Sequence, residues 1–565
     1  MSERVDMQTQ EWPLRPWLLA AICAVAGLLF HWLTDHHYPA VIAPERQAAA
    51  TFTAIATLSF VMTVEQRRWL WALAFAVGSG TVIAFVGWFT ASYNSQPTIF
   101  EWPYLSGVFA VLIAAPLFQT VRDEGGWRFP YERLHNHAWM DAVIGAASLF
   151  FTGVSFLLAW LIAGLFVLIG IDLLKDLLQE EWFGWMLAGF AFGAAVGMLR
   201  ERDALLATLQ RLVMVVFSVL APVLAAALVL FLASLPFTGL GGLWESDIPA
   251  TPLLLVAGAG AILLANAVIG NGKADRSPNA MLQWSAMALV MTVLPLAIVS
   301  ALSIGQRIGQ YGWTPERIWG VIAVAVALAY GAAAWWTVWR GRRDFDDALR
   351  PVQTRLAIGL CCVALFLALP ILDFGAISAS SQMKRFATGR IPAAEFDWRA
   401  MAFDFGPAGR ERLADIAGSG PADQRKLASA ALASKNRHDV EEQVQKTAST
   451  ANLGTRLRVV PDGVVLPTDL RSSIAATRYC RVGPCVVTLV DNRRAVIAGA
   501  LIKNDTVESA VLERDAKGVW SQDIHSRFVA KPPFRPNLST APVELRNVER
   551  RQLYVDGKPV GDAFE

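Results

Sequence analysis

Long apolar runs alternate with short polar segments through the first two thirds of the chain. A membrane-spanning helix requires about 20 mainly apolar residues. Eleven runs approach or exceed that length: 17–33, 47–64, 69–90, 103–119, 139–171, 183–199, 211–235, 251–270, 281–305, 318–339 and 355–377. The pattern predicts an α-helical polytopic membrane bundle of about 11 transmembrane helices over residues 17–377, preceded by a tail at 1–16.

Some of these runs depart from the length of a single crossing. The runs 103–119 and 183–199 are short, so we expect tilted spans or re-entrant segments there. The run 139–171 is too long for one crossing and is expected to project beyond the bilayer. Segment 171–182 has leucines at helical spacing, which predicts an amphipathic helix on the outer surface or an extension of the preceding span.

The last third of the chain follows a different pattern. Residues 378–453 show helical spacing interrupted by Gly-Pro pairs, which predicts a helical linker region. Residues 454–565 hold short apolar runs separated by turn signals such as Asp-Gly and Asp-Asn, which predicts about five to seven strands. The expected fold class is therefore a membrane bundle followed by a small soluble α+β domain with a β-rich C-terminal part.

Composition supports a membrane environment. The protein has 55% hydrophobic and only 17% charged residues, and a soluble protein of that balance would expose large apolar patches. Membrane lipids are thus the expected partners of the bundle. The net charge is +2, and no basic cluster with interleaved aromatic residues occurs, so we predict no nucleic-acid partner.

Lysine and arginine in the connections indicate how the chain is threaded, because cytoplasmic loops are enriched in them. One set of connections carries 17 of these residues: Arg4, Arg15, Arg67, Arg68, Arg122, Arg128, Arg133, Arg200, Arg202, Arg211, Lys273, Arg276, Arg340, Arg342, Arg343, Arg350 and Arg355. The alternating set carries only 4: Arg46, Lys175, Arg307 and Arg317. The N-terminus is predicted to be cytoplasmic, and an odd number of spans places residues 378–565 outside.

Two cysteines also indicate on which side of the membrane residues 378–565 lie. Cys480 and Cys485 flank a Gly-Pro turn signal, and a disulfide between them would close a six-residue ring worth about 2 kcal/mol in the chain-entropy model. Their spacing matches neither a CxxC redox motif nor a zinc set. We predict the disulfide, which fits an oxidising compartment; the alternative is a pair of unrelated reduced thiols.

The spans offer close packing rather than buried charge. Gly189, Gly193 and Gly197 recur every four residues, the small-xxx-small pattern that lets two helices approach closely. Ionisable residues are scarce in the middle of the runs, which weighs against an ion path. No catalytic set, phosphate-binding loop or dinucleotide fingerprint occurs, so no catalytic residue, metal or cofactor is predicted.

A polar hairpin, QRIGQYGWTPERIWG at 306–320, joins two long apolar runs on the predicted outer face. Gly312 is placed to end the preceding helix, and Thr314 to cap the next one. Arg307 complements the dipole of the preceding helix. The candidate functional residues of this hairpin are Gln306, Arg307, Tyr311, Gly312, Thr314 and Arg317.

Arg317 does not fit its local position. A cation in the first turn of a helix opposes the helix dipole by up to about 1 kcal/mol, so Arg317 is expected to have a partner. Three partners are open: Glu316, an acid of the outer domain, or a lipid phosphate.

Short motifs resemble those of the DUF4153 family of bacterial membrane proteins. The shared residues are Tyr311, Gly312, Thr314 and Arg317 in the hairpin, and Gly389, Phe396, Asp397, Phe403, Asp404 and Gly406 after the last span. The resemblance implies a bacterial inner-membrane protein with many spans and supplies no known activity. Relatives carry an Asp-rich turn in the terminal domain, and that pattern is lost here at 491–493.

Three functions remain open on this basis. The first is a non-enzymatic envelope scaffold or sensor, whose periplasmic residues 378–565 contact another envelope protein. The second is a transporter or flippase for an anionic or lipid-linked substrate, with Arg307 and Arg317 near its mouth. The third is a membrane enzyme acting on a lipid phosphate at the outer face.

Overall fold

The computed structural model describes most of the chain, in two compact units. The described residues are 12–35, 42–93, 101–242, 249–273, 275–393, 395–434, 437–440, 453, 456–477, 479–480, 484–500, 507–515, 518–522, 528–529, 537–544, 551–555 and 558–564. The bundle unit comprises Met1–Arg390 with Phe403–Arg410, and the C-terminal unit comprises Ile391–Ala402 with Glu411–Glu565. Most of the predicted N-terminal tail and the end of the predicted helical linker lie outside the described residues.

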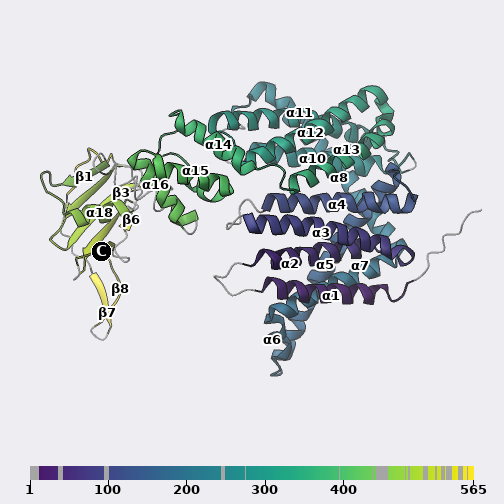
Figure 1. Cartoon of the computed structure of the whole chain (residues 1–565), viewed down its shortest axis with the longest axis horizontal. Coiled ribbons are helices and arrows are strands. Elements are labelled where there is room, and N and C mark those ends of the chain that lie inside the picture. Colours follow the sequence, from purple (N-terminus) through teal and green to yellow (C-terminus); the bar gives the residue numbers. More distant parts are fainter. Residues whose placement is uncertain are drawn as a thin grey trace, which may run out of the picture. The chain divides into compact units, whose positions relative to one another are not determined.

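The bundle unit is made of long helices (Figure 1). They are α1 (Arg15–Thr34), α2 (Pro44–Thr63), α3 (Trp69–Tyr93), α4 (Glu101–Glu124), α5 (Tyr131–Val167), α6 (Leu173–Gln179), α7 (Glu181–Arg200), α8 (Asp203–Thr238), α10 (Ala250–Ile269), α11 (Ala280–Tyr311), α12 (Pro315–Gly341), α13 (Phe345–Ala368) and α14 (Phe374–Ala387). Within the described residues, ten helices are long and apolar enough to cross a membrane. The predicted fold class is confirmed.

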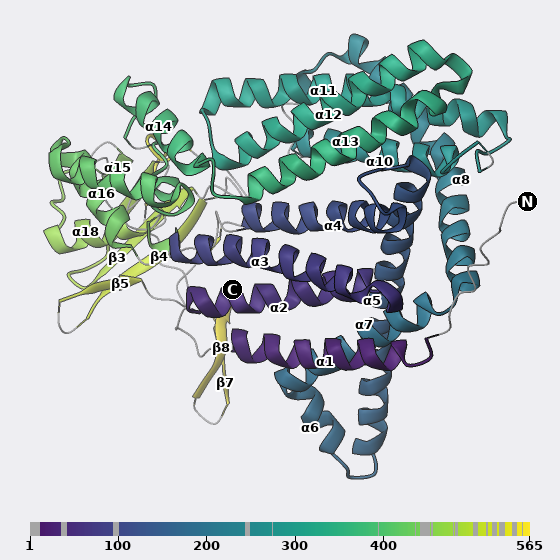
Figure 2. The same ribbon diagram turned by 45° about the vertical axis from the view of Figure 1, so that its right-hand side comes forward.

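The predicted span at 47–64 forms α2 but is not among those ten helices. Its 20 residues include several threonines, such as Thr53 and Thr63, whose hydroxyls donate to carbonyls one turn back. Figures 1 and 2 both show α2 running between α1 and α3. Arg15 at the start of α1 donates to the Val64 carbonyl at the end of α2, at 2.7 Å. Helix α2 therefore runs back to the end of the bundle where α1 starts, and it extends over the same depth of the bundle as α1.

Helix α7 packs directly on α1 through its glycines. A Cβ atom at Gly189 or Gly193 would overlap the carbonyl oxygen of Cys23 or Leu19, and one at Gly197 would overlap Pro16. In a bilayer, lipid tails are as apolar as leucine, so close van der Waals packing of this kind replaces the hydrophobic driving force between helices. The glycines therefore set the distance between α1 and α7.

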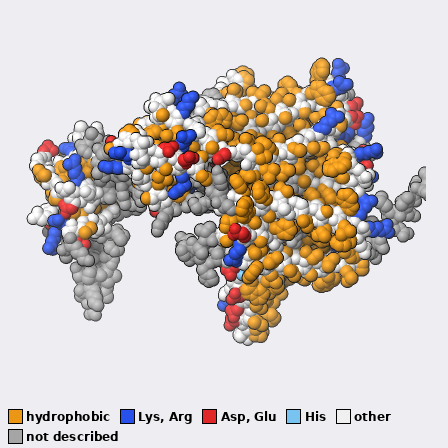
Figure 3. Space-filling model, viewed as in Figure 1, with side chains coloured by type: hydrophobic (Ala, Val, Ile, Leu, Met, Phe, Trp, Pro, Cys, Tyr) orange, Lys and Arg blue, Asp and Glu red, His pale blue; other side chains and the backbone are white. Residues whose placement is uncertain are grey.

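The surface of the bundle unit is apolar along its sides (Figure 3). Helix α5 contributes strongly to it, with Phe150, Leu157 and Leu168 more than two thirds exposed. At 37 residues, α5 is about 55 Å long, beyond the roughly 30 Å of a hydrocarbon core. Lys and Arg side chains gather at one end of the bundle in Figure 3.

The C-terminal unit contains α16 (Ala422–Ala433), most of α15 (Gly406–Ser419), α18 (Thr468–Ala476) and two sheets. Its strands are β1 (Leu457–Val460), β2 (Cys485–Leu489), β3 (Arg494–Ala500), β4 (Val507–Arg514), β5 (Trp520–Gln522), β6 (Phe528–Val529), β7 (Arg551–Val555) and β8 (Lys558–Phe564). The larger sheet has the order β1-β2-β3-β4-β5, and β6 also pairs with β4. Among the described strands, only β1 and β2 pair in parallel, with α18 as the crossover that a parallel pair requires. The β-rich part was predicted, but α18 was not.

The core of the C-terminal unit lies between α18 and the larger sheet. Leu470 and Ile474 of α18 are fully buried, as are Val487 of β2 and Ile497 of β3. The predicted disulfide between Cys480 and Cys485 is present, with a Cα–Cα distance of 5.1 Å. Both cysteines belong to this core, so the disulfide fixes the entry into β2 from the inside.

Candidate functional site

The hairpin between α11 and α12 contains the sequence-predicted site residues. Gly312 follows α11 with φ of +78°, the left-handed backbone that an L side chain rarely adopts. Thr314 is the N-cap residue of α12, although its side chain makes no capping hydrogen bond. Pro315 then occupies the first position of α12. The chain therefore reverses here through the stop and start signals that its sequence encodes.

Arg317 lies in the first turn of α12 but serves the end of α11. Its Nη1 donates to the Gly312 carbonyl at 2.6 Å, and its guanidinium lies 5.4 Å from the centre of the Tyr311 ring. A cation near the C-terminus of a helix is favourable, so the cost of its place in α12 is offset by its effect on α11. Its direct contacts are thus a backbone carbonyl and an aromatic ring, and of the three expected partners Glu316 attracts it electrostatically.

Side chains of α14 donate further hydrogen bonds to the C-terminal end of α11 and to the hairpin. Gln382 Nε2 donates to the carbonyls of Tyr311 and Trp313, at 2.9 and 3.0 Å. Arg385 donates to the carbonyls of Gly309 and Gln310. Since the last carbonyls of a helix have no partner within it, these side chains take that role.

Sequence reasoning missed the contribution of α14. Ser381, Gln382 and Arg385 lie about 70 residues after the hairpin, and Ser381 Oγ accepts from the Trp313 backbone N–H at 3.2 Å. Local capping patterns extend over only a few residues and carry no sign of such a contact. The only available signal was the presence of these polar residues immediately after the last apolar run.

The remaining hairpin residues are placed less specifically. Arg307 lies one turn before the end of α11, and electrostatic repulsion couples Arg317 to both Arg307 and Arg385. Gln306 has a buried Oε1 with no hydrogen-bond partner among the described residues. The hairpin is thus a cationic end of the bundle, held together by α11, α12 and α14.

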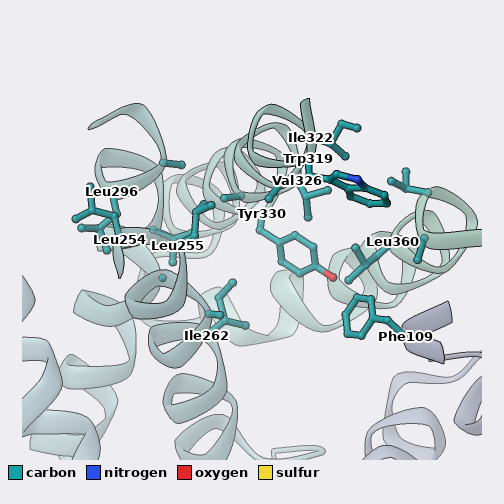
Figure 4. A pocket seen from close by; sticks show the side chains of 18 of the residues that line it. Phe109, Leu254, Leu255, Ile262, Leu296, Trp319, Ile322, Val326, Tyr330 and Leu360 are labelled. Atoms are coloured by element: carbon teal, nitrogen blue, oxygen red, sulfur yellow. The ribbon is translucent and has the colours of Figure 1, made fainter. Parts of the chain in front are cut away.

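A large apolar cavity lies within the bundle and reaches toward the hairpin (Figure 4). Its volume is about 460 Å³, and it is bounded by α4, α10, α11, α12 and α13. The lining residues are Ser106, Phe109, Leu254, Leu255, Gly258, Ala259, Ile262, Val293, Leu296, Ala297, Trp319, Ile322, Ala323, Val326, Ala327, Tyr330, Leu360, Val363, Ala364 and Leu367. Figure 4 shows the Tyr330 ring between Ile262 and Phe109, with its hydroxyl near Leu360.

A second cavity of about 170 Å³ adjoins the first. The two share Trp319 and Leu367. The second cavity is also lined by Phe89, Thr90, Trp102, Pro103, Pro315, Ala368, Leu369, Pro370, Leu372, Asp373, Phe374 and Gly375. Trp319 stacks on Trp102 with centroids 5.9 Å apart and meets Phe374 edge-on at 5.4 Å. The pair of cavities therefore has an apolar part and an aromatic part that carries one carboxylate.

Charged residues at the opposite helix ends form two ion networks. In the first, Arg122 pairs with Glu65 and Asp123, and His137 Nε2 lies 3.0 Å from Asp123. Arg122 also donates to the Thr63 carbonyl at 2.6 Å, so it closes the end of α2.

The second network joins the start of α13 to the end of α10. Arg350 Nη2 donates to Asp346 Oδ2 at 2.8 Å and to the Ile269 carbonyl at 3.1 Å. Arg276 Nη1 lies 3.1 Å from the other oxygen of Asp346, whose side chain is 1% exposed. Burial of such a group is tolerated because two guanidinium groups compensate it. The arginines that indicated orientation in the sequence thus also hold helix ends together.

At the turn that begins at Asp491, two neighbouring arginines donate hydrogen bonds to the Asp491 carboxylate. Asp491 Oδ1 accepts from the Arg493 backbone N–H at 2.8 Å, and Oδ2 accepts from Arg494 Nη2 at 2.8 Å. The backbone hydrogen bond from Arg493, followed by the bond from Arg494, lowers the pKa of Asp491. Across the described ranges, no group of three or more His, Cys, Asp or Glu side chains is arranged to hold a metal ion.

Over the described residues, ten helices long and apolar enough to cross a membrane, a cationic hairpin and a partly open apolar cavity characterise a multi-pass membrane protein with a sheet-bearing C-terminal unit. Residues 50–404 match the family model described as "Domain of unknown function (DUF4153)". The chain belongs to this family, as the hairpin and Phe-Asp-Phe-Gly motifs indicated. The matched region includes both cavities and the hairpin. No curated protein and no solved structure matches the chain.

Proposed function

We propose that this protein binds a lipid-type molecule in its bundle, with the hydrocarbon chain in the 460 Å³ cavity. The cavity carries the proposal, because its volume lies in the range typical of ligand sites and its walls are almost entirely apolar. Tyr330 and Ser106 are among the few polar groups at its surface. Hydroxyl groups in an apolar cavity can orient a ligand without requiring it to be charged.

The energetics favour a chain that is already in the membrane. Moving a hydrocarbon chain from lipid into an apolar cavity gains little hydrophobic free energy, because both surroundings are apolar. Binding must therefore rest on close contacts with groups such as Phe109 and Ile262, and on recognition of the head group at the hairpin end. A site of this design selects among lipids instead of extracting them from water.

The proposed setting is the inner membrane of a bacterium. The bias of Lys and Arg between connections supports a cytoplasmic N-terminus. An odd number of crossings, with α2 counted as the eleventh, supports a periplasmic C-terminal unit, and so does the disulfide between Cys480 and Cys485, which is favoured in that compartment. The role that fits is a non-enzymatic envelope sensor or scaffold, whose lipid site lies in the bundle and whose C-terminal unit contacts another envelope protein.

Transport of the bound lipid is the second candidate. The adjacency of the two cavities at Trp319 and Leu367 favours it, because together they lie along a line from the bundle toward the hairpin. A fluorescent lipid analogue in proteoliposomes separates the two roles. Protein-dependent exchange of the analogue between leaflets supports a transporter, whereas binding without exchange supports a sensor.

Filling the cavity tests the proposal. Ala327→Trp places a large ring in the cavity, and we expect photo-crosslinking to a lipid with a diazirine in its acyl chain to fall at least fivefold. Ala329→Trp is the matched control, because Ala329 lies on the same helix, is exposed and does not line the cavity. Crosslinking of the two variants to the same extent would contradict the proposal.

A further inference from the structure

The lining of the second cavity combines aromatic rings with a charged group, which favours a particular class of ligand. It combines the indole rings of Trp102 and Trp319 and the ring of Phe374 with the carboxylate of Asp373. Trp319 contacts both other rings, with centroid distances of 5.9 and 5.4 Å. Its volume of about 170 Å³ suits a small head group and not a second chain.

The Asp373 carboxylate has a structural role that leaves its charge uncompensated. Its Oδ1 accepts the Ala376 backbone N–H at 2.8 Å, which caps the start of α14. Among the described residues it makes no ion pair with a Lys, Arg or His side chain. An N-cap requires only a side-chain oxygen, and Asn fills that position as well as Asp. The negative charge is therefore not required for the cap, and Asp373, which is exposed, lines the aromatic cavity.

The geometry points to an ammonium group as the ligand of this second cavity. Indole faces attract cations through their quadrupole, Trp more strongly than Phe, and a carboxylate adds an opposite charge beside them. We propose that the protein prefers lipids whose head group carries an ammonium, of the ethanolamine or choline type, with the chain in the larger cavity. This inference rests on the proposed lipid binding and adds the class of head group.

A lipid is favoured over a free amine because the two cavities adjoin at Trp319 and Leu367. Trp319 lines both, so one molecule can place its ammonium against the indole while its chain extends toward Tyr330. A soluble head group would lack the contacts of the chain and bind more weakly.

Lipid titrations of the full chain, followed by native mass spectrometry, test the inference. Lipids with identical acyl chains and ethanolamine, choline or glycerol head groups are compared. Wild type is expected to bind the two ammonium lipids about tenfold more tightly than the glycerol lipid. Asp373→Asn keeps the cap and removes the charge, and should abolish most of that preference while leaving glycerol-lipid binding intact. Trp102→Leu should also reduce the preference, whereas Trp339→Leu, at an exposed site outside both cavities, should not.

The outcomes separate the two proposals. Equal binding of all three head groups by wild type, or an unchanged preference in Asp373→Asn, overturns the ammonium inference and leaves the lipid proposal standing. Absence of any lipid binding in wild type overturns both. Glycerophosphoethanolamine that competes as strongly as the intact lipid contradicts the part of the inference that requires a chain.

Discussion

At the scale of single residues, Arg317 shows how a local mismatch can be resolved by an adjacent element. Its charge is unfavourable for the helix it belongs to, yet its guanidinium bonds the Gly312 carbonyl and lies over the Tyr311 ring. Asp373 shows the converse, because its local role as a cap is fully satisfied while its charge is not. Such surplus charges are better guides to a binding site than residues whose chemistry is used within the fold.

Replacement of Arg317 tests its role in the hairpin. Arg317→Gln removes the charge-assisted hydrogen bond and the cation–π contact, and we expect a loss of about 1–2 kcal/mol of stability. Thermal unfolding of the full chain in detergent measures it. Arg128→Gln, at an exposed position in a connection, should change the stability by less than about 0.5 kcal/mol. Comparable losses in both variants would show that Arg317 does not hold the hairpin.

At the scale of elements, close helix pairs are set by small residues and helix ends by distant side chains. Helix α7 approaches α1 because Gly189, Gly193 and Gly197 present no side chain to it. Helix α14 closes the end of α11 through Gln382 and Arg385, and so links the last helix of the bundle unit to the hairpin. Neither contact depends on hydrophobic burial, which discriminates poorly between helix faces in lipid.

A methyl group at Gly193 tests the α1–α7 contact. Ala is favoured over Gly in a helix by about 0.5–1 kcal/mol, yet Gly193→Ala would force its Cβ against the Leu19 carbonyl. We expect a net loss of about 1–3 kcal/mol in unfolding measurements. Gly153→Ala in α5 is the control, because no atom lies within 4 Å of the added Cβ, and it should leave stability equal or higher. Stabilisation by both changes would rule out tight packing at Gly193.

At the scale of the whole molecule, orientation depends on the number of crossings. Helix α2 is the decisive element, because its apolar character is weaker than that of the ten clear spans. Its end nevertheless meets the starts and ends of other helices: Arg15 and Arg200 both donate to the Val64 carbonyl, at 2.7 and 3.2 Å. On this geometry we propose that α2 is a crossing as well, which would make the number odd.

Cysteine labelling in intact cells tests this threading. Val465→Cys, at a site 89% exposed, is expected to react with a membrane-impermeant maleimide from outside. Leu14→Cys and Trp127→Cys, at sites 69% and 86% exposed, should react only after permeabilisation. Wild type measures the background from its native thiols. Labelling of Leu14→Cys and Trp127→Cys on opposite sides would show that α2 does not cross, and protection of Val465→Cys would reverse the proposed orientation.

The hairpin illustrates how far sequence reasoning extends toward the candidate site. Gly312 and Thr314 were identified as helix stop and start signals, because such signals act over a few residues. Ser381, Gln382 and Arg385 were not identified, because they contact the hairpin from a separate helix. The ion networks were likewise present in the sequence only as a bias in charge, with no indication that Asp346 and Arg350 are buried partners.

The sequence by itself determined the apolar spans, the class of protein, the family and the disulfide, because length, composition and short-range spacing specify each of these. The tertiary structure alone decided which helix faces meet. Phe109, Ile262, Trp319 and Leu360 come from four helices, and only their packing creates the cavity. In a membrane, core and lipid are equally apolar, so hydrophobic periodicity does not distinguish a cavity wall from a lipid-facing surface. For the same reason, the aromatic cavity at Asp373 could be found only in three dimensions.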